Sequence, residues 1–185
     1  MDSRLPSRKE AAMKLVEHVS DDYQRLHAKM VAEVLGAYAK KLGEDEDLWY
    51  ITGLLHDLDY CEFPQEHPKR ELAWFEEWNY PSELIHAVEA HARSIIGVEP
   101  NSLLACAILA VDELSGFLYA YSLMRPEGFA GMELSSVKKK FKDKAFARKV
   151  DRTEVNYGVE KMGLPFEELA GFMIGVFLGL EEFKR

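Results

Sequence analysis

The chain has 185 residues, of which 48% are hydrophobic and 30% charged, with only 12 glycines and 7 prolines. These values are typical of a globular domain large enough to bury a core, and they exclude a disordered or low-complexity protein. The net charge of −9 argues against general nucleic-acid binding, because proteins with that function present a basic surface.

The first two predicted helices are marked by capping residues. Ser7 and Glu10 have the spacing of a capping box, in which two side chains and two backbone N–H groups bond reciprocally. A second helix begins at one of the two aspartates at 21–22, either of which can cap it, and ends at Gly43. On its apolar face, His27 precedes by one turn a stripe made of Val31, Val34, Leu35, Tyr38 and Leu42.

The third predicted helix begins between residues 44 and 47 and carries His56 and Asp57 at its far end, after an apolar approach. An imidazole beside a carboxylate is costly to bury unless something binds both. A divalent cation accepts a neutral nitrogen and an anionic oxygen, and adjacent helical side chains, about 100° apart, can reach one ion at a helix edge. The dipeptide alone fits equally well a helix end whose polar residues face water.

Two more histidines accompany the next two predicted helices. Pro68 suits the first turn of the fourth helix, which places His67 at its start. The fifth helix follows Pro81, and His91 shares its apolar face with Leu84, Ala87 and Val88. His86 lies about 140° around that helix from His91, so we leave it out of any shared site.

The sixth predicted helix is long and very apolar, and Asp112 lies on its inner face after nine apolar residues at 103–111. An unpaired carboxylate there would cost several kcal/mol or become protonated. After a loop at 125–132 come a basic helix from about Ser136, a short helix, and an apolar helix that follows Pro165.

This succession predicts an all-α fold with roughly seven to nine helices and essentially no sheet, because no alternating strand pattern interrupts it. The apolar run at 169–180 is shorter than a bilayer span and flanked by acids, so we expect a buried helix and no membrane segment. Residues 1–10 lack the apolar core of a signal peptide. Cys61 and Cys106 form no CxxC pair and are expected to be reduced thiols in a cytoplasmic protein.

Several polar residues therefore stand on apolar faces or at helix ends. A single histidine on an apolar stripe is commonly a hydrogen-bonded core residue. Separate explanations for each residue would require several independent costs of burial, whereas one shared metal centre explains them together. The candidate ligands are His27, His56, Asp57, His67, His91 and Asp112.

Four sequence motifs are similar to those of a known family: Gly53-Leu-Leu-His-Asp57, Glu66-His67-Pro68, Ala87-Val-Glu-Ala-His91 and Ala110-Val-Asp112-Glu-Leu114. In this order they resemble the HD superfamily of metal-dependent phosphohydrolases over roughly residues 15–119. Residues 136–147 resemble the C-terminal part of a group of predicted HD hydrolases without an assigned substrate. The resemblance implies an HD-domain helical bundle at 1–124, with 125–185 as a helical C-terminal extension packed on the same domain.

The resemblance also implies roles for the six residues. In the family, the positions of His27, His56, Asp57 and Asp112 hold one metal. Members with two further histidines, matched here by His67 and His91, hold a second metal, with Asp57 bridging and central to catalysis. The alternative for that pair is a single metal, with His91 hydrogen-bonding beside it and His67 outside.

The chemistry of this ligand set narrows the metal only in part. Mixed imidazole and carboxylate ligation suits one or two ions of Fe, Mn, Co, Ni or Zn and does not choose among them. Two such ions clamp a phosphoryl oxygen and activate a water molecule as the nucleophile. Asp59 and Glu66 either orient the metal ligands by hydrogen bonding to them or are solvated surface acids.

A basic segment at 138–152 contains eight basic and two acidic residues, a local charge of +6 that leaves −15 for the rest of the chain. On a continuous helix Lys140, Lys144 and Arg148 fall at i, i+4 and i+8, beside an apolar stripe, and could bind a substrate phosphate near the metals. The alternative is a solvated helix face. Nucleic-acid binding is disfavoured, because no aromatic platform accompanies the segment.

We therefore predict a metal-dependent phosphohydrolase that acts on a small phosphorylated metabolite or nucleotide. One alternative is a di-iron oxygenase, since some HD proteins with this six-ligand pattern cleave substrates with O₂. The other is a non-catalytic sensor that binds a nucleotide through the helix of Lys140. The sequence leaves the oligomeric state open.

Overall fold

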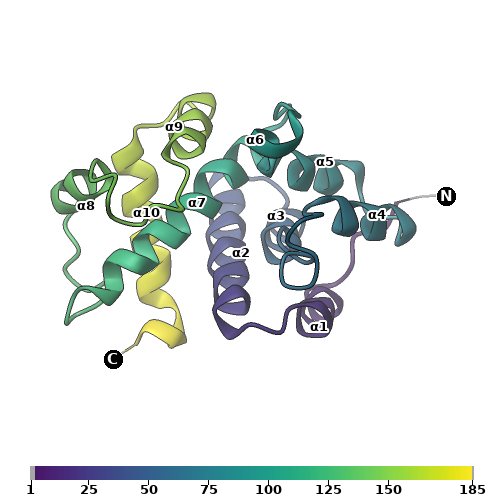
Figure 1. The fold of residues 1–185 in the computed structure, drawn as a ribbon, viewed down its shortest axis with the longest axis horizontal. Helices are drawn as coiled ribbons and strands as arrows, with labels where there is room; N and C mark the ends of the chain where they lie inside the picture. Colours follow the sequence, from purple (N-terminus) through teal and green to yellow (C-terminus); the bar gives the residue numbers. More distant parts are fainter. Residues whose placement is uncertain (1–2, 185) are drawn as a thin grey trace. The chain divides into compact units, whose positions relative to one another are not determined.

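The structure is a computed structural model that describes residues 3–184, and within that range it contains ten α-helices, one 3₁₀ turn and no strand (Figure 1). The elements are α1 (Arg8–His18), α2 (Asp22–Leu42), α3 (Glu46–Leu55), α4 (Lys69–Glu77), α5 (Ser82–His91), α6 (Arg93–Ile96), α7 (Leu103–Leu123), α8 (Leu134–Phe141), α9 (Arg152–Lys161), α10 (Phe166–Gly179) and η1 (Glu181–Phe183). The predicted all-α class is confirmed. The predicted number of helices was too low, because the chain forms the one-turn helix α6 directly after α5.

The chain divides into two compact units, Met1–Ile108 and Leu109–Arg185. The division falls inside α7, between the sixth and seventh residues of that helix. The predicted organisation as a core at 1–124 with an extension at 125–185 stays a prediction. Each unit has its own core, and the candidate site is built from the first.

Capping side chains begin the first helices where the sequence predicts them. Ser7 and Glu10 form the capping box of α1, with both the side-chain and the backbone bonds present. Asp21 accepts a hydrogen bond from the backbone N–H of Gln24 at 2.9 Å and begins α2. Gly43 ends α2 in the left-handed conformation, with φ of 78°, which glycine adopts without steric cost.

Helices α2 and α3 approach so closely that only glycine fits at one contact. A Cβ atom on Gly53 would lie 2.9 Å from both the Cα and the backbone nitrogen of Ala32. The contact is backbone against backbone, so no side-chain rotation could relieve it. This approach brings the C-terminal end of α3 beside α2, and the rings of His27 and His56 have centroids 5.5 Å apart.

The core of the first unit combines aliphatic side chains of α1, α2, α3 and α5 with Phe75 of α4. Burial of this apolar surface supplies most of the driving force for folding. Its fully or almost fully buried members are Ala11, Leu15, Val19, Ala28, Ala32, Ile51, Leu54, Leu55, Leu58, Phe75, Leu84 and Val88.

The second unit is rich in phenylalanine. Phe141 of α8 meets Phe117 of α7 and Phe166 of α10, with ring centroids 5.1 and 4.7 Å apart. Phe129 meets Phe177 and Phe183 in the same way, at 5.1 and 4.8 Å. Such pairs add stabilisation beyond the area that they bury.

Helix α7 is long and apolar enough to cross a membrane by length and composition, but 67% of its most apolar 18-residue window is buried inside the protein. Buried core helices meet the same criterion. Helices α9 and α10 meet it only when taken as one segment, and they are bent by 102° at their junction. The predicted absence of a membrane segment stays a prediction.

Candidate metal centre

The chain leaves helical geometry at the residues that the sequence singled out. Helix α3 ends at Leu55, and His56 is its C-cap residue. A series of turns then carries the chain to Lys69, where α4 begins. His56, Asp57 and His67 all lie at the edges of this turn segment, and His91 lies on the last turn of α5.

Three histidines are held in one orientation by bonds to Nδ1. His56 Nδ1 lies 2.8 Å from the carbonyl oxygen of Gly53, and His91 Nδ1 bonds to the carbonyl oxygen of Val88. A carbonyl oxygen can only accept, so Nδ1 carries the proton in both rings. His67 Nδ1 lies 2.7 Å from Asp59 Oδ1, which likewise accepts. In each neutral ring, Nε2 is therefore the nitrogen with a lone pair.

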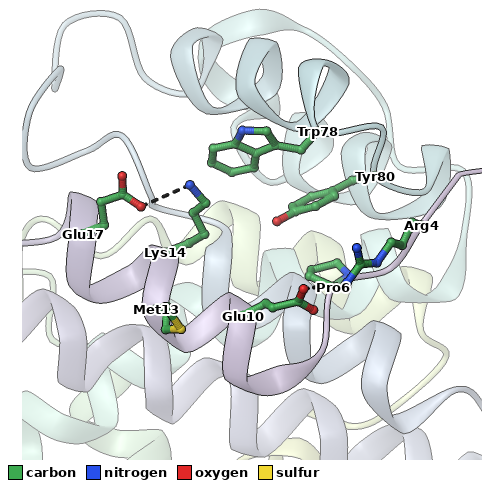
Figure 2. A pocket seen from close by; sticks show the side chains of 8 residues that line it. All are labelled: Arg4, Pro6, Glu10, Met13, Lys14, Glu17, Trp78 and Tyr80. Atoms are coloured by element: carbon green, nitrogen blue, oxygen red, sulfur yellow. Dashed lines mark hydrogen bonds and ion pairs between the residues drawn. The ribbon is translucent and has the colours of Figure 1, made fainter.

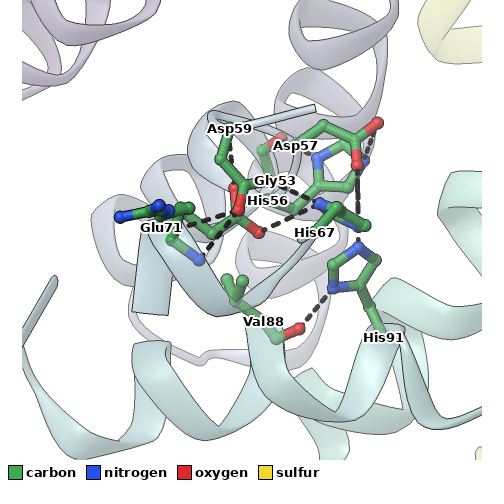
Figure 3. Close-up of polar contacts among 9 residues, drawn as sticks. Gly53, His56, Asp57, Asp59, His67, Glu71, Val88 and His91 are labelled. Atoms are coloured by element: carbon green, nitrogen blue, oxygen red, sulfur yellow. Dashed lines mark hydrogen bonds and ion pairs between the residues drawn. The ribbon is translucent and has the colours of Figure 1, made fainter. Parts of the chain in front are cut away.

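These Nε2 atoms converge on one carboxylate (Figure 3). His56 Nε2 lies 3.6 Å from Asp57 Oδ2, while His67 Nε2 and His91 Nε2 lie 3.5 and 3.7 Å from Asp57 Oδ1. The histidine side chains are 0–6% exposed and that of Asp57 is 19% exposed. Asp57 thus meets different histidines with its two oxygens.

This arrangement fits a divalent metal. A neutral Nε2 and a carboxylate oxygen are both acceptors, so no hydrogen bond joins them, and burying them together is unfavourable without a cation. Imidazole and carboxylate are ligands that first-row transition metals prefer. The atoms of Asp57, His67 and His91 lie within 4.8 Å of one another, close enough to share an ion.

The structure places the other two predicted ligands differently. His27 is 7% exposed and lies beside His56 in the first unit. Asp112 belongs to the second unit, so its part in the ligand set stays a prediction. Of the four residues predicted for the first metal, the first unit therefore contributes His27, His56 and Asp57.

Two buried carboxylates lie near Nδ1 of His67. Asp59 and Glu71 are both fully buried, which settles the sequence alternatives for Asp59 against a surface acid. Burial, together with the nearby carboxylates of Asp59 and Asp57, raises the pKa of Glu71 well above its usual range. Glu71 was not predicted from the sequence, because an acid in the first turn of a helix ordinarily faces solvent; its spacing of four residues from His67 was the available signal.

Glu66, the other acid considered as an orienting residue, lies outside the site. Its side chain is 49% exposed and pairs with Arg70 at 2.8 Å. His86 also lies apart, as expected, with Nδ1 3.8 Å from Glu89.

A separate cavity of about 410 Å³ opens between the N-terminal segment with α1 and the end of α4 (Figure 2). Trp78 and Tyr80 form its aromatic side, and Lys14 lies 4.4 Å from the Trp78 ring centroid. None of its lining residues is a predicted site residue. The cavity is lined by Arg4, Pro6, Glu10, Met13, Lys14, Glu17, Trp78 and Tyr80.

The basic segment differs from the prediction. Helix α8 ends at Phe141, so Lys144 and Arg148 do not continue it, and the helical spacing that put them on one face with Lys140 was wrong. Asp143 explains this end, since its Oδ1 accepts from the backbone N–H of Ala145 at 3.1 Å in a local turn. Phosphate binding by the three residues stays a prediction, although Lys140 already pairs with Asp143 at 3.0 Å.

Comparisons with known proteins found similarity over the part of the chain that contains the predicted ligands. A family model described as HD domain matches residues 26–116. Ribonuclease Y from Oleidesulfovibrio alaskensis is 35% identical over 95 residues, which are 49% of this chain and 17% of that protein. The chain therefore matches less than a fifth of that relative's length. No solved structure gave a match.

Proposed function

We propose that this chain, in which residues 26–116 match a family model described as HD domain, hydrolyses a phosphate ester of a small metabolite or nucleotide, as the resemblance to the HD superfamily of metal-dependent phosphohydrolases implies. One observation carries the proposal: three Nε2 atoms lie 3.5–3.7 Å from the oxygens of Asp57. This set of acceptors suits metal ions on both sides of one carboxylate, which is the requirement of a two-metal hydrolase.

The protein's own residues prepare the site before any substrate arrives. Asp57 bridges the two sides, with Oδ2 toward His56 and Oδ1 toward His67 and His91. The Nδ1 bonds fix each ring's tautomer and increase the basicity of Nε2. A bound divalent metal supplies Lewis acidity toward the phosphoryl oxygen and acidifies water.

The substrate class is inferred from the distribution of charge. The charge of +6 at 138–152 favours an anionic substrate, and Lys144 and Arg148 of that segment are exposed. The relative is by name a ribonuclease, so RNA is an alternative phosphodiester substrate. The net charge of −9 favours a small substrate instead.

The experiment begins with metal analysis of the purified protein. Hydrolysis is then assayed after loading with Fe, Mn, Co, Ni or Zn, against nucleotides, phosphorylated sugars and a short oligoribonucleotide. Asp57→Ala should lose bound metal and activity together, because it removes the carboxylate that all three histidines face. Glu66→Gln, which alters an exposed acid nearby, is the matched control and should change neither.

The other outcomes are equally informative. A full metal complement in Asp57→Ala would contradict the ligand assignment. Bound iron with substrate-dependent O₂ consumption and no phosphate release would support the oxygenase instead. Tight nucleotide binding without turnover in every metal would support the sensor.

A further inference from the structure

The two buried carboxylates behind His67 form a reciprocal hydrogen-bonded pair. Asp59 Oδ2 accepts from the backbone N–H of Glu71 at 3.1 Å, and Glu71 Oε2 accepts from the backbone N–H of Asp59 at 3.2 Å. Each side chain thus bonds the backbone of the other residue, which joins the turn segment to the first turn of α4. The geometry resembles a capping box, except that the partners are 12 residues apart.

Asp59 also performs the capping that α4 lacks locally. Pro68, the N-cap residue, provides no side-chain cap bond. Asp59 Oδ2 instead accepts from the backbone N–H of Arg70 at 3.1 Å, in addition to that of Glu71. A negative charge at a helix N-terminus is further stabilised by the helix dipole. These bonds hold the carboxylate plane and direct the remaining oxygen, Oδ1, at His67.

His67 is the group that this framework orients. Its Nδ1 lies 2.7 Å from Asp59 Oδ1 and 3.8 Å from Glu71 Oε1, while its Nε2 lies 3.5 Å from Asp57. Both acids are fully buried, and burying two carboxylates is costly unless each is bonded. A helix cap alone would need only one of them, and a serine or asparagine as the N-cap residue at position 68 would serve as well.

We propose that Asp59 and Glu71 are positioning residues that hold His67 as its Nδ1–H tautomer, with Nε2 toward Asp57. Through His67 they set the affinity for the metal held by Asp57, His67 and His91, and leave the metal beside His56 unaffected. The inference rests on the proposed function for the identity of the site, but it is tested by tautomer and metal binding, neither of which requires turnover.

Asp59→Asn gives the sharpest test, because it changes one donor–acceptor relation. The amide oxygen can still accept from the backbone of α4, while the NH₂ group faces His67 Nδ1 as a donor. Nδ1 must then accept, and the proton moves to Nε2, where it points at Asp57 and blocks the metal. A residue with a merely structural role would not reverse the tautomer.

The first readout is the ¹⁵N shifts of His67 in metal-free protein, at a pH above the imidazole range. Wild type should show protonated Nδ1, and Asp59→Asn should show protonated Nε2. Protonated Nε2 in the wild type would overturn the proposal, and this measurement remains decisive if the variant fails to fold.

The second readout is calorimetric titration with Mn²⁺ or Co²⁺. The site of Asp57, His67 and His91 has fewer ligands than the four predicted for the first metal, so we expect it to give the weaker of two binding events. Asp59→Asn should weaken that event about 10–100-fold, as loss of an orienting partner typically does, and leave the tighter event within about threefold. Glu66→Gln, an exposed acid one residue from His67, should leave both events unchanged. Equal affinities in Asp59→Asn and wild type would overturn the proposal.

Glu71 is tested by a pair of variants of similar size. Glu71→Leu removes the acceptor for the backbone of Asp59 and should weaken the second event, whereas Glu71→Gln retains an acceptor and should restore it. Equal affinity in the two variants would overturn the role of Glu71. An effect of Asp59→Asn in a protein without phosphatase activity would reject the proposed function and leave this inference standing.

Discussion

Two segments of the molecule are each organised by one charged side chain, and they use it in opposite ways. In the first unit, the turns between α3 and α4 gather around Asp59, which bonds two backbone N–H groups and His67. In the second unit, the loop between α8 and α9 gathers around Arg152. Its guanidinium donates five hydrogen bonds, at 2.6–3.2 Å, to the carbonyl oxygens of Phe141, Asp143, Phe146, Ala147 and Val150.

The difference lies in what each segment leaves to bind a ligand. The five N–H groups of Arg152 all meet carbonyl oxygens, so the residue has no donor left for a substrate phosphate. Around Asp59 the bonds are complete too, but they direct His67 so that its lone pair faces another acceptor, Asp57. Acceptors that face acceptors in a buried position indicate a cation site, whereas complete pairing indicates a structural role.

Replacing Arg152 should have the largest effect on stability. Arg152→Met keeps much of the apolar stem and leaves the loop carbonyls without their donor, which should lower the free energy of unfolding by about 2–4 kcal/mol. Urea denaturation followed by far-ultraviolet circular dichroism measures this change. Metal content should match that of wild type, since the residue has no role in binding.

Arg148→Met is the control, because it removes the same charge from an exposed position four residues away. It should change stability by no more than about 0.5 kcal/mol. Equal losses in the two variants would mean that charge, and not the carbonyl bonds, accounts for the effect.

The features that could be predicted from the sequence are those determined by neighbouring residues along the chain. Helical periodicity and capping residues such as Ser7, Asp21 and Gly43 act within one or two turns, so the helices and several of their ends were predictable. The end of α8 was missed, because the basic and apolar spacing continues past Phe141 while the local turn at Asp143 competes with the helix.

The residues of the candidate site also fall into those that could be predicted from the sequence and those that could not. His56, Asp57 and His91 were found because each is a polar residue in an apolar context. The bonds of Glu71 and Arg152 could not be predicted, since the partners lie 12 residues away or on irregular backbone and no pattern encodes those bonds; only the spacing of Glu71 from His67 gave a signal. The tie between α2 and α3 at Gly53 is of the same kind.

Gly53→Ala tests that tie and should have an intermediate effect. The added Cβ would meet the Ala32 backbone at 2.9 Å and force the helices apart, which should cost about 1–3 kcal/mol. Because His56 Nδ1 bonds to the carbonyl of Gly53, metal affinity should fall as well. Denaturation and metal titration measure the two losses.

The matched control lies in the second unit. Gly175 is a helical glycine in α10, and a Cβ there would meet nothing within 4 Å. Gly175→Ala should therefore stabilise the protein by about 0.5–1 kcal/mol through helix propensity and leave metal binding unchanged. Destabilisation by this control would show that α10 is packed more closely than its surroundings indicate.

The smallest expected effect on stability is that of His67→Ala, and this variant distinguishes a centre with one metal from a centre with two. His67→Ala removes one of two histidines beside Asp57 Oδ1 but leaves His56 beside Oδ2. The site of Asp57, His67 and His91 has fewer protein ligands than the four predicted for the first metal, so it should be the weaker one. Only its binding event should therefore disappear. Loss of the bond to Asp59 should cost about 1 kcal/mol in stability. His86→Ala, which alters a histidine outside the cluster, should retain both events. A single event in wild type that persists in His67→Ala would establish a mononuclear centre, with Asp59 and His67 serving only the fold.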